Sequence, residues 1–431
     1  MTAPAPRRAL GADVRLREVW AWSMYDFANS GYTTVVITAV FSAYFVSVVA
    51  EKAVWATFAW TAALSASYAL IMVTAPLIGA WADAYAAKKK LLAITTAGCI
   101  VCTALLWFAG PGTLAVSILL IVLSNYFFGA GENLIAAFLP ELADSEAMGR
   151  VSGWGWSVGY LGGLVSLGVC LAYITWAQGQ GIPAAEFVPA TMLITAFLFA
   201  IASLPTFLFL RERGKPRRAQ SNAMGAAWSR VLKTMREAQR YRDLRRFLLC
   251  VVFYQAGIQA VIALAAIYAQ EAMKFTTQQT IALILVVNVT AAIGAFAFGY
   301  LQDSIGHVRA VSLTLLGWIA MVIIAGMAQG TGAFWIAANI AGLCMGASQA
   351  AGRAMVGVLA PPDRLGEFFG LWGLAVKLAS IFGPLSYGLM TWIFAGDHRT
   401  AIMVLGVYFV IGLIILHGVD MQRGRAAALA A

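Results

Sequence analysis

The chain has 431 residues, of which 61% are hydrophobic and only 11% charged, with a mean hydropathy of +0.81. Soluble globular domains carry about 25% charged residues, so this composition excludes a large soluble protein and indicates one that crosses a membrane many times. The net charge of +10 does not indicate a nucleic-acid partner, because most of the basic residues lie in the terminal segments and loops of one side. We therefore expect no interaction with nucleic acid.

Apolar runs of roughly 20 residues follow one another along the chain, each long enough to cross about 30 Å of hydrocarbon as a helix. A backbone in lipid must satisfy its own hydrogen bonds, and no alternating barrel pattern occurs, which predicts an all-α membrane protein. The predicted transmembrane helices cover residues 20–49, 55–82, 91–110, 114–138, 151–176, 188–210, 247–270, 277–301, 309–328, 333–358, 367–394 and 399–418. They form an N-terminal six-helix bundle (1–210) and a C-terminal six-helix bundle (247–431), joined by a cytoplasmic basic linker (211–246).

Lysine and arginine residues indicate how these helices are oriented. Nearly all of the 29 lie in the terminal segments and the loops of one side, and only Lys52, Lys274 and Arg399 lie on the other. The positive-inside rule then places both termini in the cytoplasm, and we expect no removable signal peptide. The five cysteines lie in apolar runs without histidine ligands nearby, so we expect no metal or other cofactor. These features predict a monomeric, multi-pass protein of the bacterial inner membrane.

The linker contains a second periodic element. Trp228, Val231, Leu232, Met235 and Tyr241 recur at helical spacing, with basic residues between them. A basic amphipathic helix of this kind suits the anionic inner leaflet of the bilayer. An ordinary linker helix packed on the bundle is the alternative.

The two halves carry the same loop signature. Gly79-x-x-x-Asp83 closes the second predicted helix and Gly299-x-x-x-Asp303 closes the eighth, each followed within a few positions by basic residues, Arg309 in the second copy. A second pair of glycine motifs, after the fourth and tenth helices, repeats at nearly the same offset. Duplicated halves with the binding site between them are a recurrent transporter design. Carboxylates at such helix ends can meet a neighbouring helix N-terminus or a basic side chain, which predicts a role in gating.

These loops resemble the signature of the major facilitator superfamily. The resemblance implies two six-helix bundles, alternating access, and a central cavity lined by helices 1, 4, 7 and 10. The first copy departs from the pattern, since Ala84 replaces a basic residue and Ala86 a glycine. One salt-bridge partner and the tight turn are therefore uncertain in that copy, and the three lysines that follow could compensate.

Further stretches resemble a narrower group, the bacterial "unknown major facilitator" family, which is related to the fungal autophagy-associated vacuolar effluxers. They are residues 22–30 (WSMYDFANS), 139–163 and 349–384. The fungal relatives imply efflux of amino acids, which we take as an analogy, because a shared fold does not fix a substrate.

Ionisable side chains inside hydrocarbon are costly unless they face a partner or a wet cavity, so each is a candidate functional residue. The chain has four, with the acids Asp26 and Glu132 in the first half and the bases Arg353 and Lys377 in the second. Three interpretations stay open. The acids and bases could bind a zwitterion, one acid could carry a proton because partial burial raises its pKa, or the groups could pair as a gate on the cytoplasmic side.

Uncharged polar residues complete the candidate site. Asn29 and Asn133 lie beside the two acids and join them as candidates for substrate binding or proton coupling. The candidates for lining the cavity are Tyr25, Tyr32, Asn125, Tyr254, Gln255, Gln259, Asn288, Asn339 and Gln349. Any one of these residues could instead make an ordinary hydrogen bond between helices.

The leading functional hypothesis is secondary active transport of a small polar or zwitterionic solute, with an amino acid as one example and protons or another ion as the coupling partner. The chain has no phosphate-binding G-x-x-x-x-G-K-[ST] motif and no catalytic motif for a membrane-embedded enzyme. The alternatives are a transporter of a larger amphiphile, such as a lipid, peptidoglycan fragment or siderophore, and a non-transporting sensor that keeps the fold.

Overall fold

The computed structural model describes residues 13–142, 148–213, 229, 232–233, 235–361 and 365–430. Within these residues the secondary structure is helical throughout, and 12 helices are long and apolar enough to cross a membrane. The predicted all-α class with twelve spans is therefore confirmed.

The contacts divide the chain into two compact units. Unit 1 comprises residues 1–37 and 73–227, and unit 2 comprises residues 38–72 and 228–431. The linear division of the sequence at 210 and 246 stays a prediction, whereas the contacts group residues 38–72 with helices of the second half.

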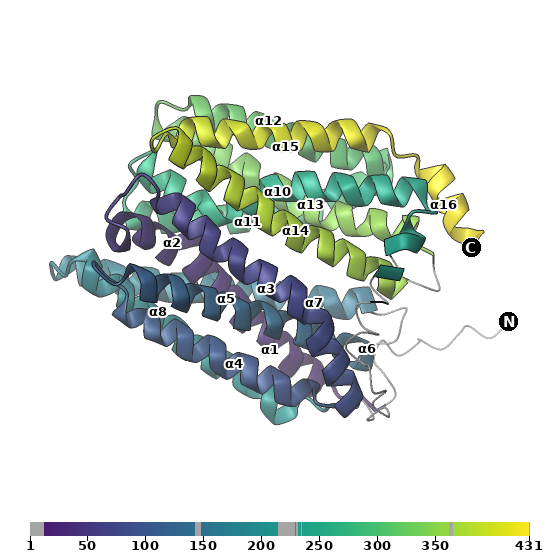
Figure 1. Ribbon diagram of the computed structural model, residues 1–431, viewed down its shortest axis with the longest axis horizontal. Coiled ribbons are helices and arrows are strands. Elements are labelled where there is room, and N and C mark those ends of the chain that lie inside the picture. The colour runs from purple at the N-terminus through teal and green to yellow at the C-terminus, as the bar shows by residue number, and fades with distance from the viewer. Residues whose placement is uncertain are drawn as a thin grey trace. The chain divides into compact units, whose positions relative to one another are not determined.

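The first half begins with one long span built from four segments and continues with five further spans (Figure 1). Its segments are α1 (Leu16–Tyr32), the π-helix η1 (Thr33–Ala39), α2 (Phe41–Tyr44), the π-helix η2 (Phe45–Val49), α3 (Ala56–Tyr85), α4 (Lys88–Leu105), the 3-10 helix η3 (Leu106–Phe108), α5 (Leu114–Ala136), α6 (Leu139–Leu142), α7 (Met148–Gly179) and α8 (Ala184–Phe209). In unit 1, α1 packs against α7 and α8, and α4 packs against α5 and α8.

The second half repeats the arrangement of six spans and adds a short terminal helix. Its helices are α10 (Arg242–Glu271), α11 (Thr277–Ile305), α12 (His307–Met327), α13 (Thr331–Leu359), α14 (Leu365–Ile393), α15 (His398–His417) and α16 (Met421–Leu429). In unit 2, α10 packs against α14 and α15, α11 against α13, and α12 against α13 and α15 (Figure 1). The pairing of α10 with α14 repeats that of α1 with α7, as expected for duplicated halves.

Two of the three points at which the chain passes from one unit to the other lie at helix irregularities. The first crossing, after Ile37, falls within the π-helix η1, where the β-branched run Thr33–Thr38 crowds a regular helix. The second crossing lies between Met72 and Val73 of α3. Pro76 lies inside this helix and has no N–H to donate to the carbonyl of Met72. Both crossings therefore coincide with weakened helical hydrogen bonding.

The segment Thr38–Met72 packs in unit 2 through the first part of α3. Phe58 stacks on Trp392 of α14 with ring centroids 5.1 Å apart. Two turns further on, the hydroxyl of Ser65 donates a 3.0 Å hydrogen bond to the carbonyl of Ile381. These contacts run antiparallel along α14.

Only part of the predicted linker helix lies within the described residues, since Trp228 and Val231 fall outside them. Residues 235–238 are helical, and Leu232 and Met235, one turn apart, are 49% and 51% exposed. This half-exposed apolar pair is compatible with a membrane-surface helix.

Candidate functional site

Asp26 lies in the seam between α1 and α7 of unit 1. Its side chain is half-buried, and a Cβ on Gly155 of α7 would collide with the Asp26 carboxylate and with the ring of Trp22. The same seam continues at Gly159, where a Cβ would lie 3.0 Å from the hydroxyl of Ser30. Glycines on α7 thus let α1 approach closely enough to enclose an ionisable side chain.

The other predicted acid, Glu132, lies on α5 near the end of the helix. Glu132 is half-buried, its neighbour Asn133 is exposed, and Asn125, two turns earlier, is fully buried. Asn133 therefore occupies a different environment from the acid beside which it was predicted to act.

Asn29 lies one turn after Asp26 on α1 and is 6% exposed. Neither its amide nitrogen nor its amide oxygen has a hydrogen-bond partner in the described residues. The tyrosines on the same helix are satisfied, since Tyr25 bonds the hydroxyl of Thr96 at 2.8 Å and Tyr32 bonds that of Ser124 at 2.9 Å. Both tyrosines thus act as interhelical contacts within unit 1, and Asn29 is left as a buried group with unused hydrogen-bonding capacity.

The polar candidates of unit 2 gather on α10 and α13. Gln255 is fully buried and its Nε2 donates to Oε1 of Gln349 over 3.3 Å. The remaining oxygen of Gln255 has no partner among the described residues, and the buried hydroxyl of Tyr254 interacts with the Gln255 side chain beside it. Gln259, one turn further along α10, is half-buried.

Two asparagines of unit 2 are used locally instead. The amide nitrogen of Asn339 donates to the carbonyl of Trp335 at 2.8 Å, and that of Asn288 donates to Ile284 at 2.9 Å. Both bonds reach back one turn along the same helix, which removes one donor of each residue from any site. Arg353 lies on α13, and its side chain is outside the described part of the structure.

Lys377, the other predicted base, lies near the middle of α14 and is half-buried. Its ammonium group is 5.6 Å from the centroid of the Tyr68 ring on α3. This is a cation–π contact within unit 2, and it continues the series of α3–α14 contacts described above.

The predicted gating loops join α3 to α4 and α11 to α12. Gly79 lies in α3, Gly299 in α11, and Arg309 is exposed in the first turn of α12. The side chains of Asp83 and Asp303 lie outside the described part of the structure, so their predicted gating contacts stay predictions.

The tight turn is present in both loops. Gly306 has a φ of 89° between α11 and α12, and Ala86 has a φ of 47° between α3 and α4. The first copy therefore keeps a left-handed residue at the matching position, although it has lost the glycine that adopts this conformation without strain.

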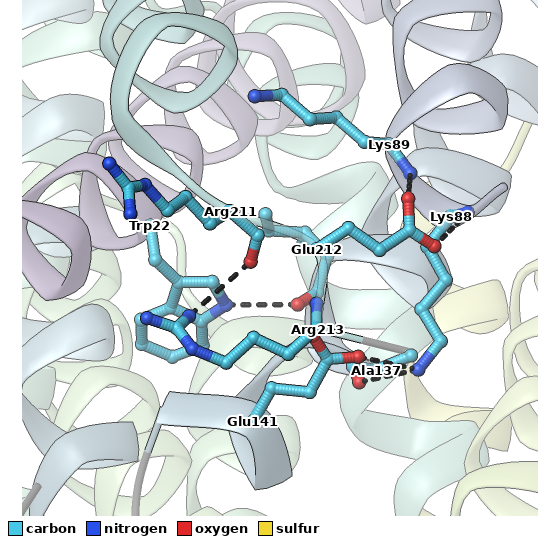
Figure 2. Close-up of polar contacts among 9 residues, drawn as sticks. Trp22, Lys88, Lys89, Ala137, Glu141, Arg211, Glu212 and Arg213 are labelled. Carbon is cyan, nitrogen blue, oxygen red and sulfur yellow. Dashed lines mark hydrogen bonds and ion pairs between the residues drawn. The ribbon is translucent and has the colours of Figure 1, made fainter. Parts of the chain in front are cut away.

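Two of the three lysines of the first loop, Lys88 and Lys89, are bound within unit 1, as Figure 2 shows. The carboxylate of Glu212 accepts the backbone N–H of Lys88 at 2.7 Å and of Lys89 at 3.1 Å. These N–H groups open α4, whose N-cap Ala87 has no side chain to bond them. Glu212 therefore caps the helix from a distant part of the chain and meets its positive dipole end.

Arg213 extends this cluster to the start of α1. Its guanidinium binds Glu18, which is 2% exposed, at 2.9 Å, and its backbone N–H donates to Glu141 at 2.7 Å. Lys88 adds an ion pair of 3.0 Å to Glu141. Residues 211–213, the start of the predicted basic linker, are thus bound to α1, α4 and α6. We call them the 211–213 clasp, and Figure 2 shows its contacts with α4 and α6.

Unit 2 has a corresponding clasp at the start of α10. Asp243, 3% exposed, accepts two hydrogen bonds from Arg423 of α16, at 2.7 and 2.6 Å, and a third from the backbone of Asp420 at 3.0 Å. The Asp243 carboxylate raises the pKa of Arg423 above its ordinary value. Arg246 donates to the carbonyl of Gly418 at 2.6 Å.

The two clasps follow one plan. In each half, a buried acid in the first turn of the first helix binds an arginine that follows the last membrane-spanning helix: Glu18 with Arg213, and Asp243 with Arg423. Sequence reasoning missed these acids because it searched the centres of the apolar runs. An acid directly before an apolar run, in both halves, was the available signal.

Comparison with known proteins gives the family. The profile of the family described as "Vacuole effluxer Atg22 like" matches residues 56–149 and 143–429. The uncharacterized MFS-type transporter YxiO of Bacillus subtilis is 28% identical over 403 residues, covering 92% of this chain and 93% of that protein. Autophagy-related protein 22-1 of Aspergillus fumigatus is 25% identical over 332 residues, covering 70% of this chain and 54% of the fungal protein.

Solved structures with the same fold share little sequence. A mutant of the nucleoside transporter NupG superposes with a TM-score of 0.72 at 14% identity, covering 94% of this chain and 100% of that one. A bacterial homologue of the human lysosomal transporter Spinster, inward-facing and unoccupied, gives a TM-score of 0.71 at 14% identity, covering 96% of this chain and 98% of that one. These likenesses confirm the fold, and the profile match extends over most of the chain. The protein is therefore a multi-pass membrane protein of the Atg22-like family of major facilitator superfamily transporters.

Proposed function

We propose that this protein moves a small polar or zwitterionic solute, such as an amino acid, across the bacterial inner membrane by alternating access, coupled to protons. Asn29 is the observation that carries this proposal. It lies eleven residues beyond Glu18, or about 16 Å along the helix at 1.5 Å per residue, close to the middle of a bilayer core of about 30 Å. A buried amide without a partner costs about 1–3 kcal/mol, a cost that a bound polar solute would offset.

The position of the ionisable groups supports the zwitterionic class and the coupling. Asp26 lies one helical turn from Asn29, and Gly131-Glu132 of α5 matches Gly352-Arg353 of α13 at an offset of 221. Transporter halves of this kind bind substrate near the midplane between the repeats. We assign proton transfer to Asp26 or Glu132, because intramembrane carboxylates commonly serve as proton relays.

The direction of transport and the orientation of the chain in the membrane are proposed from the family description and from the distribution of basic residues. The family description names an effluxer, and we propose export from the cell. We also propose that both termini face the cytoplasm and that the basic linker binds anionic lipids of the inner leaflet, with Leu232 and Met235 inserted among them.

The first experiment identifies a solute class. Purified protein is screened by thermal shift against the proteinogenic amino acids, and also against lipids, peptidoglycan fragments and siderophores. A solute present at 100 times its dissociation constant stabilises the folded state by about 2.7 kcal/mol, which a melting curve resolves. Stabilisation by amphiphiles alone would contradict the small-solute proposal.

The second experiment tests coupling in proteoliposomes with the solute so identified. Asp26→Asn or Glu132→Gln should abolish accumulation driven by a proton gradient and leave solute exchange intact. Glu186→Gln, at an exposed acid in the first turn of α8, is the matched control and should behave like wild type. Gradient-driven accumulation that survives in both acid variants would refute the proton assignment.

A further inference from the structure

An apolar groove lies between α12 and α15 of unit 2, two helices that pack side by side (Figure 1). It has a volume of about 290 Å³. The side chains that line it are apolar, and they include Val322, Ile323, Met403, Val407 and Val410, with Gly406 among them. A water needs only roughly 10–15 Å³ but two to four polar partners, which these side chains do not supply. The α12–α15 groove therefore suits an apolar chain and not a row of waters.

The groove opens on the hydrocarbon side of the protein. Both helices are membrane spans, and only 33% of the apolar stretch of α15 is buried within the protein. Val407, in the groove, is 55% exposed. The fully buried rings of Trp318 and Phe409 stack 5.2 Å apart and hold α12 and α15 together. The groove is thus a preformed concave surface that lipid chains contact.

An arginine without an acidic partner lies at one end of the groove. Arg399 precedes Met403 by one turn of α15 and lies on the same face. Both contact Gly326 of α12, where a Cβ would collide with the Met403 sulfur and where the carbonyl accepts a long 3.5 Å bond from the guanidinium. The guanidinium also lies 3.9 Å from the sulfur of Met273, and within the described residues no carboxylate pairs with it. The carboxylate of Asp397 bonds only the backbone N–H of Arg399.

The distance from the arginine to the far end of the groove matches the depth of one leaflet. Arg399 is the second residue of the span that begins at His398. Val410 follows eleven residues later, or about 16 Å along the helix at 1.5 Å per residue. This is about half of a hydrocarbon core of about 30 Å. A phospholipid with its phosphate at the membrane surface sends its acyl chains through the same depth.

We propose that the α12–α15 groove binds one phospholipid, with an acyl chain along the groove and the phosphate at Arg399. A guanidinium binds phosphate oxygens through two parallel hydrogen bonds, which suits arginine to this headgroup. A chain without a phosphate would leave the guanidinium unpaired, and free phosphate would leave the groove unused. With both termini in the cytoplasm, this lipid belongs to the outer leaflet. The site does not depend on which solute the protein moves.

Native mass spectrometry of the delipidated full-length protein tests the chemistry with three probes. Dioleoylphosphatidylglycerol carries the chains and the phosphate, dioleoylglycerol carries only the chains, and glycerol 3-phosphate carries only the phosphate. Wild type should bind the first at least roughly tenfold more tightly than either of the others, because only this probe combines a charge-assisted bond with buried chains. Equal binding of dioleoylglycerol would exclude the phosphate contact and overturn the proposal.

Two variants with matched controls locate the lipid. Val407→Trp fills the groove, and its control is Val101→Trp on α4, at a position that is also 55% exposed. Arg399→Gln removes the charge, and its control is Lys52→Gln, at an exposed base assigned to the same side of the membrane. Each test variant should retain one phosphatidylglycerol fewer than wild type, and each control should retain the full number. Full retention in either test variant would overturn the proposal.

Two further readouts separate lipid binding from loss of stability and from self-association. The rise in melting temperature on adding dioleoylphosphatidylglycerol is measured from the lipid-free value of each variant, so a lower starting stability does not imitate lost binding. This rise should be smaller in Val407→Trp than in Val101→Trp, and equal rises would contradict the site. Wild-type dimers that Val407→Trp dissociates without loss of bound lipid would show that a second copy covers the groove, which would also overturn the proposal.

Discussion

The turn between α3 and α4 offers a quantitative test of the loop signature. Ala86 holds a φ of 47°, while the matching position in the second half is Gly306 with a φ of 89°. The left-handed conformation costs a residue with a Cβ about 1–2 kcal/mol. A glycine removes this cost but adds about 0.4–1 kcal/mol of unfolded-state entropy. Ala86→Gly should therefore stabilise unit 1 by a net value of about 0.8 kcal/mol, within a range of about 0–1.6 kcal/mol.

The assay is thermal unfolding in detergent or nanodiscs, where 1 kcal/mol moves the melting temperature by about 2–4 °C for a cooperative unit of 150–250 residues. Gly306→Ala is the matched control. Gly306 has a ψ of 156°, a region that is essentially restricted to glycine, so alanine there should cost at least about 1–3 kcal/mol. A lower melting temperature for Ala86→Gly, or no loss for Gly306→Ala, would refute the assignment of backbone strain to the first copy of the signature.

Three further predictions concern contacts at the helix ends and on α14. Tyr68→Leu should lower the free energy of unfolding by about 0.5–2 kcal/mol, because it removes the ring beside Lys377, whereas Tyr68→Phe keeps the ring and should cause no such loss. Equal losses in the two variants would exclude a stabilising cation–π contact. Glu18→Gln should destabilise the protein by about 1–3 kcal/mol. The double variant Glu18→Arg with Arg213→Glu should be more stable than the sum of its two single variants predicts, and simple additivity would show that the pair does not interact. The Asp397 carboxylate caps α15, and the hydroxyl of Thr400 donates a hydrogen bond to this carboxylate, which lowers the pKa of Asp397. Its stabilisation is therefore present at neutral pH and lost as pH falls through this lowered pKa, so Asp397→Ala should cost about 0.5–2 kcal/mol at pH 7 and much less at a pH below the lowered pKa.

The fold could be read from the sequence because hydrocarbon imposes a simple requirement. Each span needs about 20 apolar residues and must satisfy its own backbone, so the number and order of helices followed from hydropathy alone. The helix starts were less accurate, because hydropathy marks the apolar stretch and not the polar first turn. α10 begins at Arg242 and α4 at Lys88, several residues before the predicted starts. Glu212 caps the first turn of α4, and Asp243 in the first turn of α10 binds Arg423 of α16.

Side-chain partners were predictable only in part. The ionisable candidates were found because they interrupt apolar runs. Their surroundings were not, since a glycine 129 positions away in the chain determines where Asp26 lies. The bond between Trp22 and the Ile135 carbonyl, at 2.9 Å, and the capping of α4 by Glu212 have the same origin. No local pattern encodes such pairings, because they depend on which helices become neighbours.

The grouping of Thr38–Met72 with unit 2 determines how this transporter can be dissected. Cutting the chain in the linker yields two fragments that match the sequence repeat and divide the packing units. The N-terminal fragment would retain Phe58 and Ser65 without their partners on α14, and the C-terminal fragment would lack the segment that covers Trp392 and Ile381. Each fragment would still hold its own clasp. Each separately produced half would therefore lack contacts that it needs to fold fully. Recovery of structure on mixing the two halves would report on the contacts between the segment Thr38–Met72 and α14.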